Sequence, residues 1–132
     1  MMKKGLNIAL ATGRRKTAVA RIYMRKGAGK ITVNGKDAET YFPLDLQRQL
    51  IRAPLVACNI EGVDLIINVR GGGLEGQAVA VRHALSRALV KADEDRRPVL
   101  KEKGFLTRDP RKRERKKYGQ PGARKRFQFC KR

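Results

Sequence analysis

The sequence predicts an α+β fold, with a small sheet of about four strands, helices on one face, and a long, basic, extended C-terminal tail. Two observations predict it. Apolar residues recur with the period of a strand or a helix as far as residue 106, and this periodicity then stops. Residues 107–132 also carry a formal charge of +10, half of the +20 of the whole chain. We therefore expect a globular α+β RNA-binding body over residues 1–106 and a tail over residues 107–132 that is disordered when free.

The first part of the body is expected to be mostly strand. Leu6–Ala11 and Ala18–Met24 have strand-like composition, and the polar residues Thr12–Lys16 between them predict a turn. A shorter strand over Lys30–Val33 is followed by Asn34-Gly35, a strong signal for a hairpin.

The N-terminal residues also resemble a secretory signal, but the apolar stretch is too short and Asn7 interrupts it. The alternation of Leu6, Ile8 and Leu10 favours a strand. Cys58 and Cys130 lie far apart and form no zinc spacing or disulfide framework, which is typical of a reducing, cytoplasmic compartment.

The middle of the body is expected to contain a helix and a strand. Over Asp45–Arg52, the residues Leu46, Leu50 and Ile51 form one helical face, and Pro54 ends that helix or opens the next one. The clearest strand is Val63–Val69, with four apolar side chains on one side: Val63, Leu65, Ile67 and Val69.

The longest helix is expected from about Gly76 to Lys91. Its apolar stripe consists of Ala78, Val81, Leu85, Ala88 and Leu89, and the polar residues that lie away from it are Gln77, Arg82 and Arg87. A short last helix is expected to be capped by Asp93 or Asp95, with Pro98 in its first turn and Gly104 at its end.

The segment Gly71–Gly76 has the spacing G-x-G-x-x-G of a dinucleotide-binding loop. Three features count against a cofactor. Glu75 places a negative charge in the loop, the acidic residues about twenty positions on (Glu94 and Asp95) directly follow a helix, and the chain has no room for the required parallel sheet. A KH-type loop is also disfavoured, because that loop joins two helices. A tight glycine turn near an RNA phosphate fits better.

No catalytic or metal site is expected. His83 is the sole histidine and has no neighbouring nucleophile, and the acidic cluster 93–95 reads as capping or solvated surface. We expect no cofactor and no small-molecule substrate. A membrane partner is also disfavoured, since the sequence has neither a long apolar span nor an aromatic-tipped basic amphipathic helix.

The basic residues favour nucleic acid as the partner. Arg14-Arg15-Lys16 would project together from one edge of the sheet, although short charge runs are often only solvated surface. In the tail, the runs 111–117 and 124–126 are interleaved with Tyr118, Phe127 and Phe129, whose rings can stack on bases. A nuclear-localisation or nonspecific polycationic tail is the open alternative.

Several motifs together resemble the bacterial-type small-subunit ribosomal protein S-nine family. The opening signature is Thr12-Gly13-Arg14-Arg15-Lys16-Thr17-Ala18-Val19-Ala20-Arg21, and the central motif is Gly71-Gly72-Gly73-x-x-Gly76-Gln77-Ala78 with Arg82-His83-Ala84. The tail is similar in Leu106-Thr107-Arg108-Asp109-x-Arg111-x-x-Glu114-Arg115-Lys116-Lys117 and in Gln128-Phe129-Cys130-Lys131-Arg132. One departure is Cys130, where the family usually has Ser.

The resemblance implies a fold like the second domain of ribosomal protein S-five, and a place in the head of the small subunit on the 3′ major domain of its ribosomal RNA, beside neighbouring head proteins. It implies a cytoplasmic ribosome, with an organelle ribosome left open. Lys131 and Arg132 would approach tRNA in the peptidyl site. The expected ribosomal RNA contacts are Arg14, Arg15, Lys16, Arg21, Gly71, Gly72, Gly73, Gln77, Arg82, His83, Arg108, Arg111, Lys112, Arg113, Arg115, Lys116, Lys117, Tyr118, Arg124, Lys125, Arg126 and Phe129.

Two other functions remain open at this point. A free protein that compacts DNA or RNA would need only the tail, and would bind any duplex with similar affinity. A small enzyme built on the glycine loop would bind a mononucleotide or dinucleotide saturably.

Overall fold

A computed structural model describes residues 8–126 and residue 128 of the chain. It contains one five-stranded mixed sheet in the order β1-β2-β5-β3-β4. The strands are β1 (Ala9–Arg15), β2 (Ala18–Lys26), β3 (Ile31–Val33), β4 (Lys36–Asp37) and β5 (Val63–Arg70). The helices are α1 (Ala38–Tyr41), α2 (Asp45–Ala57), α3 (Leu74–Ala92), the 3₁₀ turn η1 (Glu94–Arg96) and α4 (Arg97–Glu102).

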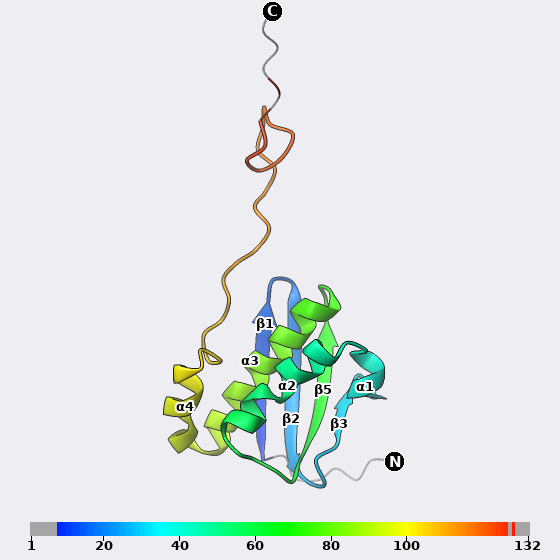
Figure 1. Ribbon diagram of the computed structural model, residues 1–132, viewed down its shortest axis with the longest axis vertical. Coiled ribbons are helices and arrows are strands. Elements are labelled where there is room, and N and C mark those ends of the chain that lie inside the picture. Colours follow the sequence, from blue (N-terminus) through cyan, green and yellow to red (C-terminus); the bar gives the residue numbers. More distant parts are fainter. Residues whose placement is uncertain (1–7, 127, 129–132) are drawn as a thin grey trace, which may run out of the picture.

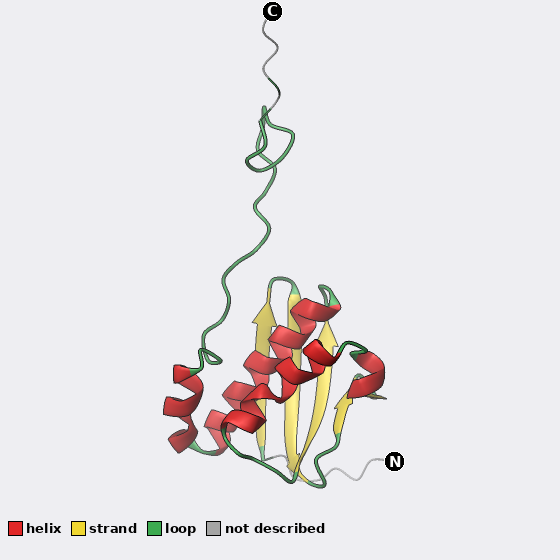
Figure 2. Ribbon diagram, viewed as in Figure 1, coloured by secondary structure: helices red, strands yellow, loops and turns green. Residues whose placement is uncertain are grey.

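Helices α2 and α3 lie on the same face of the sheet, and the other face is left open (Figures 1 and 2). The predicted α+β class is thus confirmed, with one strand more than expected. The extra strand is the two-residue β4, which pairs with β3 across the predicted Asn34-Gly35 turn. Both turn residues have positive φ, +50° and +79°, as a two-residue hairpin turn requires.

Strand β5 is the centre of the sheet, because it pairs antiparallel with β2 and parallel with β3. Its predicted inward face is confirmed: Leu65 and Ile67 are fully buried, and Val69 is 7% exposed. Where β3 ends, the side-chain amide of Asn34 continues the ladder by pairing with both backbone groups of Val69, at 2.9 and 3.0 Å.

Strand β1 differs from its prediction in length and in the face it buries. It continues to Arg15, so the predicted turn over Thr12–Lys16 is reduced to Lys16 and Thr17. The residues it turns toward the helices are Ala9, Ala11 and Gly13, whereas Leu10 is 45% exposed on the open face. The predicted face was therefore the wrong one for the described part of the strand, and Leu6 lies outside the described residues.

Close packing of α3 explains this choice of face. A Cβ atom built on Gly13 would lie 2.2 Å from the carbonyl oxygen of Ala80 and 2.3 Å from the amide nitrogen of Ala84. Only small residues fit beneath a helix that approaches so closely, and the larger apolar residues of β1 consequently face away from it.

Helix α2 also differs from its prediction, since it runs through Pro54 to Ala57. Its buried side is formed by Gln47, Ile51 and Pro54, while Leu46 is 69% exposed. Proline removes one backbone hydrogen bond from a helix. Here the ring is buried against the core, and the amide of Cys58 still bonds to the carbonyl of Pro54 at 3.1 Å.

Helix α3 begins at Leu74, two residues before the expected start, and its predicted apolar stripe is fully buried. Gln77, which was expected to lie away from the stripe, is only 8% exposed because α3 is covered on more than one side. After α3, Pro98 lies in the first turn of α4 and Gly104 follows its end with φ +76°, both as predicted. The predicted cap lies elsewhere: the side chain of Asp93 accepts a hydrogen bond from the amide of Asp95 and caps the 3₁₀ turn η1, whereas α4 follows Arg96 without a side-chain cap.

Beyond α4, Phe105 and Leu106 still pack against the core. From residue 107 onward the described chain forms neither helix nor strand, and Figure 1 shows it leaving the body as a long irregular segment. Within the described residues, no helix is both long and apolar enough to cross a bilayer.

Candidate nucleic-acid interface

The tip of the β1–β2 hairpin places its basic residues on two faces of the sheet. Side chains alternate along a strand, and Gly13 faces the helices. Arg14 therefore faces the open side, and Arg15 faces the helix side, where its side chain is 14% exposed. The expectation that these charges project together is thus wrong for this pair. Lys16, with φ +52°, forms with Thr17 the exposed turn between β1 and β2.

The glycine loop after β5 packs directly on this hairpin tip. Gly71 has φ +75°, and a Cβ atom there would lie 2.4 Å from the carbonyl oxygen of Thr17. Gly72, with φ +62°, has more room, since a Cβ atom there would lie 3.2 Å from the Cβ atom of Ala18. The loop and the hairpin tip therefore form one surface beside the first turn of α3.

Gln77 holds this surface together from below. Its Nε2 donates to the carbonyl of Gly71 at 2.9 Å, and its Oε1 accepts from the hydroxyl of Tyr41 at 2.8 Å. A buried amide satisfied in this way has little left to offer a ligand. In place of the RNA contact expected for Gln77, we assign it to positioning the loop.

The dinucleotide alternative finds no support in this arrangement. That fold needs a second parallel strand after the helix that follows the loop. In the described part of the chain, α3 is followed only by η1 and α4. Nor do the described residues contain a cluster of three or more His, Cys, Asp or Glu that would hold a metal ion.

The open face of the sheet carries a second group of cations. In the strand register Arg14 is opposite Val19, which is opposite Arg70, and in the next row Arg21 is opposite Asn68. Arg21 and Arg70 line a shallow hollow with Asn68 between their strands. Sequence reasoning had found Arg21 but not Arg70. The alternation of β5 already placed Arg70 on the other face from the buried Val69. Only the strand pairing shows that Arg70 and Arg14 lie in the same row of the sheet, with Val19 between them.

The helix side carries an arginine cluster that joins residues far apart in the chain. The Arg15 Nε lies 3.6 Å from the Asp109 carboxylate, which also accepts hydrogen bonds of 2.7–3.0 Å from the Arg111 guanidinium. These bonds from Arg111, with the charge of Arg15, hold the pKa of Asp109 well below its usual range. The pKa of Arg82 is lowered by burial and by Arg15.

Two further contacts fix the start of the tail to α3. The Arg82 guanidinium stacks 5.1 Å from the centre of the Phe105 ring, and His83 Nε2 lies 3.2 Å from the carbonyl oxygen of Leu106. Together with Asp109, these contacts place the expected contact residues Arg15, Arg82, His83, Arg108 and Arg111 in one region. We call residues 105–111 the tail root.

Farther along the tail the cations are exposed. The Glu114 carboxylate accepts from Lys117 and, at 3.0 Å, from Arg124, and so closes a loop around Tyr118, which is 95% exposed. Exposed ion pairs of this kind contribute little and are easily exchanged for phosphate. The remaining expected tail contacts, Lys112, Arg113, Arg115, Lys116, Lys125 and Arg126, are all exposed, and Phe129, Lys131 and Arg132 lie outside the described residues.

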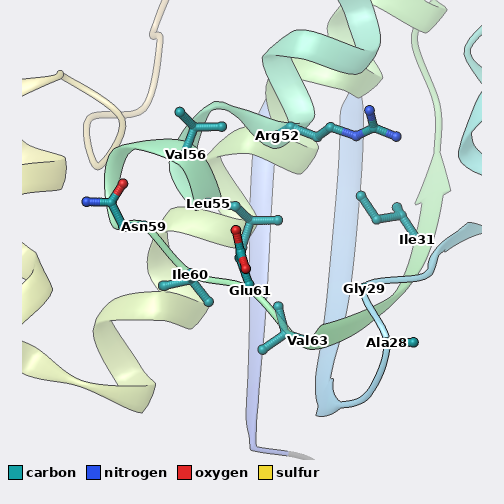
Figure 3. A pocket seen from close by; sticks show the side chains of 11 residues that line it. Ala28, Gly29, Ile31, Arg52, Leu55, Val56, Asn59, Ile60, Glu61 and Val63 are labelled. Carbon is teal, nitrogen blue, oxygen red and sulfur yellow. The ribbon is translucent and has the colours of Figure 1, made fainter.

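The molecule has a different kind of hollow between the end of α2 and the start of β5 (Figure 3), with a volume of about 620 Å³. Its walls include Ile31, Leu55 and Val56, and among the lining residues Arg52 is balanced by Glu61. A hollow with apolar walls and no net charge does not suit a polyanion. The cations described above make the better nucleic-acid interface.

Comparison with known proteins gives a consistent result. The family described as ribosomal protein S9/S16 matches residues 13–132. The small ribosomal subunit protein uS9 of Borrelia hermsii is 52% identical over 130 residues, covering 98% of this chain and 96% of the relative. The protein of the same name from Borreliella burgdorferi is 53% identical over 128 residues, covering 96% and 94%.

Proposed function

The chain belongs to the ribosomal protein S9/S16 family, and we propose that it is a structural protein of the small ribosomal subunit that binds the ribosomal RNA. The observation that carries this proposal is the identity of 52–53% over nearly the full length of proteins named small ribosomal subunit protein uS9. Its place of action would be the ribosome, in the cytoplasm of a bacterium.

The physical properties of the chain support an RNA partner. A net charge of +20 on 132 residues repels itself unless a polyanion neutralises it. The cations are gathered on the open face, at the hairpin tip and along the tail root and tail. We propose these as the ribosomal RNA contacts, with the glycine loop supplying backbone amides near the first turn of α3.

A ribosomal role is distinguishable from general compaction of nucleic acid by specificity. A protein that recognises one folded RNA must retain its affinity in the presence of excess unrelated duplex, because phosphate contacts alone carry no sequence or shape information. The arginine cluster and the glycine loop are both held in position by contacts within the protein. This favours recognition of one RNA surface of defined shape.

We expect the tagged protein to sediment with small ribosomal subunits, and to bind a transcript of the 3′ major domain at least about tenfold more tightly than a duplex of equal length. The measurement is gradient sedimentation of a lysate, followed by competition binding at physiological salt. Equal affinity for both RNAs and absence from the subunit fraction would favour the compacting function instead.

We also propose that the end of the tail reaches tRNA in the peptidyl site through Lys131 and Arg132. The proposal rests on the family to which the chain belongs, since both residues lie outside the described part of the structure. The described part of the tail leads away from the body (Figure 1), so cations farther along it can meet a distant phosphate without rearrangement of the body.

Removal of Lys131 and Arg132 is expected to leave subunit assembly nearly normal and to weaken tRNA binding to isolated small subunits by roughly tenfold or less, since charge-assisted contacts are partly screened by water and salt. Filter binding of tRNA to purified mutant subunits across a salt series measures this. Unchanged affinity at low salt would show that these residues do not contact tRNA.

A further inference from the structure

A second basic groove lies on the side of the molecule, between α3, α4 and the tail root. Its volume is about 420 Å³, and the side chains that line it are His83, Arg87, Val90, Lys91, Arg97 and Leu106. Three of the six are permanent cations, and none is acidic. Arg87, Lys91 and Arg97 are not among the contacts expected from the sequence.

The cations of this groove are held in place by the edge of the sheet. Arg87 Nη1 donates to the carbonyl of Thr12 at 2.7 Å, and Lys91 Nζ donates to the carbonyl of Leu10 at 3.0 Å. Both carbonyls belong to β1, which is an edge strand. Each contact uses one donor and leaves others free, because a guanidinium has five N–H donors and an ammonium has three. Both side chains are thus held in position and still have N–H donors available for a ligand.

His83 also lines this groove, and one nitrogen of its ring has no hydrogen-bond partner among the described residues. A carbonyl oxygen only accepts, so Nε2 must carry the proton that it shares with Leu106. In neutral His83 the other nitrogen, Nδ1, is then an acceptor, and it is buried with no hydrogen-bond partner in the protein. Because Nδ1 is buried, a phosphate in the groove would act on the ring through its negative charge, which favours the protonated imidazole.

The spacing suits a chain of phosphates better than a single ion. His83, Arg87 and Lys91 stand four residues apart on one side of α3, so the row extends for about 12 Å along the helix. Arg97 faces it from α4, where it is paired only with the exposed carboxylate of Glu94 at 3.2 Å. Figure 1 shows α4 and the start of the tail beside the C-terminal half of α3, so one wall of the groove continues into the tail.

We propose that this groove binds the phosphodiester backbone of RNA, through Arg87, Lys91, Arg97 and a protonated His83. The proposal rests on the RNA-binding function proposed above, and it adds a contact surface separate from the hairpin tip and the glycine loop. RNA held here would pass along the tail root, where the arginine cluster continues the line of positive charge.

The groove makes RNA affinity depend on pH in a defined direction. In the free protein, burial lowers the pKa of His83, and the charges of Arg87, Arg108 and Arg82 lower it further, against the bond to Leu106, which raises it. Lys91 and Arg97 also line the groove. A bound phosphate favours the charged imidazole and raises this pKa. RNA affinity should then increase as the pH falls from 8 to 5, and His83→Gln should lose most of that increase, since this is the sole histidine.

The test uses the full-length protein and a transcript of the 3′ major domain. Arg97→Gln is expected to weaken binding by about threefold to tenfold and to reduce the slope of log affinity against log salt by about 1. Arg52→Gln is the matched control, because it removes the same charge from the apolar hollow and is expected to leave the slope unchanged. Circular dichroism of both variants checks that they fold.

A second measurement observes the groove directly. The imidazole signals of His83 in NMR spectra should shift when the transcript is added, and its pKa should rise in the complex. The groove proposal would be contradicted if Arg97→Gln left the salt slope unchanged and the His83 signals did not shift, in a protein that still binds the transcript. The proposed function would then remain intact. A shift caused by inorganic phosphate alone, with none caused by RNA, would mean a small-anion pocket and would equally contradict the groove proposal. A wild-type protein that binds no transcript would instead contradict the proposed function.

Discussion

Deletion of residues 107–132 is expected to remove most of the salt dependence of RNA binding. The deleted segment carries 12 of the 32 Lys and Arg residues. If all of them met phosphates of single strands, they would contribute up to about −8 to the slope of log affinity against log salt, at roughly −0.7 for each neutralised charge. A slope of that size corresponds to a loss on the order of 10³–10⁵ in affinity between 50 and 200 mM salt.

The experiment needs a variant that separates charge from attachment, because the tail root also packs on the body. Replacing Lys112, Arg113, Arg115, Lys116 and Lys117 by Gln keeps the root contacts and the chain length, and is expected to reduce the slope by about 3 to 4. Anisotropy of a labelled 3′ major domain transcript across a salt series measures both variants. A slope as steep as that of the wild type would mean that the tail does not meet the RNA backbone.

The local periodicity of apolar residues correctly predicted the elements that pack against a single layer. The stripe on α3 and the inward face of β5 follow from periodicity, because each packs a continuous apolar surface against one layer. The face of β1 did not follow. Its large apolar residue Leu10, and Ile8 just before the strand, look like core residues, but the close approach of α3 at Gly13 leaves space only for Ala and Gly on the inner face. Such proximity belongs to the tertiary structure and has no local signature.

The sequence predicted which residues form the candidate interface better than it predicted how they are arranged. The charge pattern identified Arg15, Arg82 and Arg111, but it could not show that a single carboxylate, Asp109, lies between Arg15 and Arg111. Nor could it show that Lys91 crosses the edge of the sheet to reach β1. The contact of Lys91 with Leu10 joins positions 81 residues apart, and that of Arg15 with Asp109 joins positions 94 residues apart. Both depend on how α3 and the tail root lie against the hairpin.

Gly71→Ala is expected to destabilise the body and to weaken RNA binding together. Two costs add at this position. Alanine at φ +75° adopts a left-handed conformation, which costs about 1–2 kcal/mol. Its Cβ atom would also lie 2.4 Å from the carbonyl oxygen of Thr17, and relieving such an overlap typically costs about 1–3 kcal/mol. The expected loss of unfolding free energy is about 2–5 kcal/mol, measured by urea denaturation.

The chain offers a matched control two residues away. A Cβ atom on Gly73 meets nothing within 4 Å, and its backbone φ of −101° is open to any residue, so Gly73→Ala should change stability by less than about 0.5 kcal/mol. For Gly71→Ala the strain is relieved only by separating the glycine loop from the hairpin tip. That separation moves Lys16 away from the first turn of α3 and breaks the bond from Gln77 to Gly71. RNA affinity, measured under conditions where both variants remain folded, should therefore fall for Gly71→Ala more than for Gly73→Ala. Equal RNA affinity and equal stability of the two variants would show that the contact between the glycine loop and the hairpin tip does not position the RNA-binding residues.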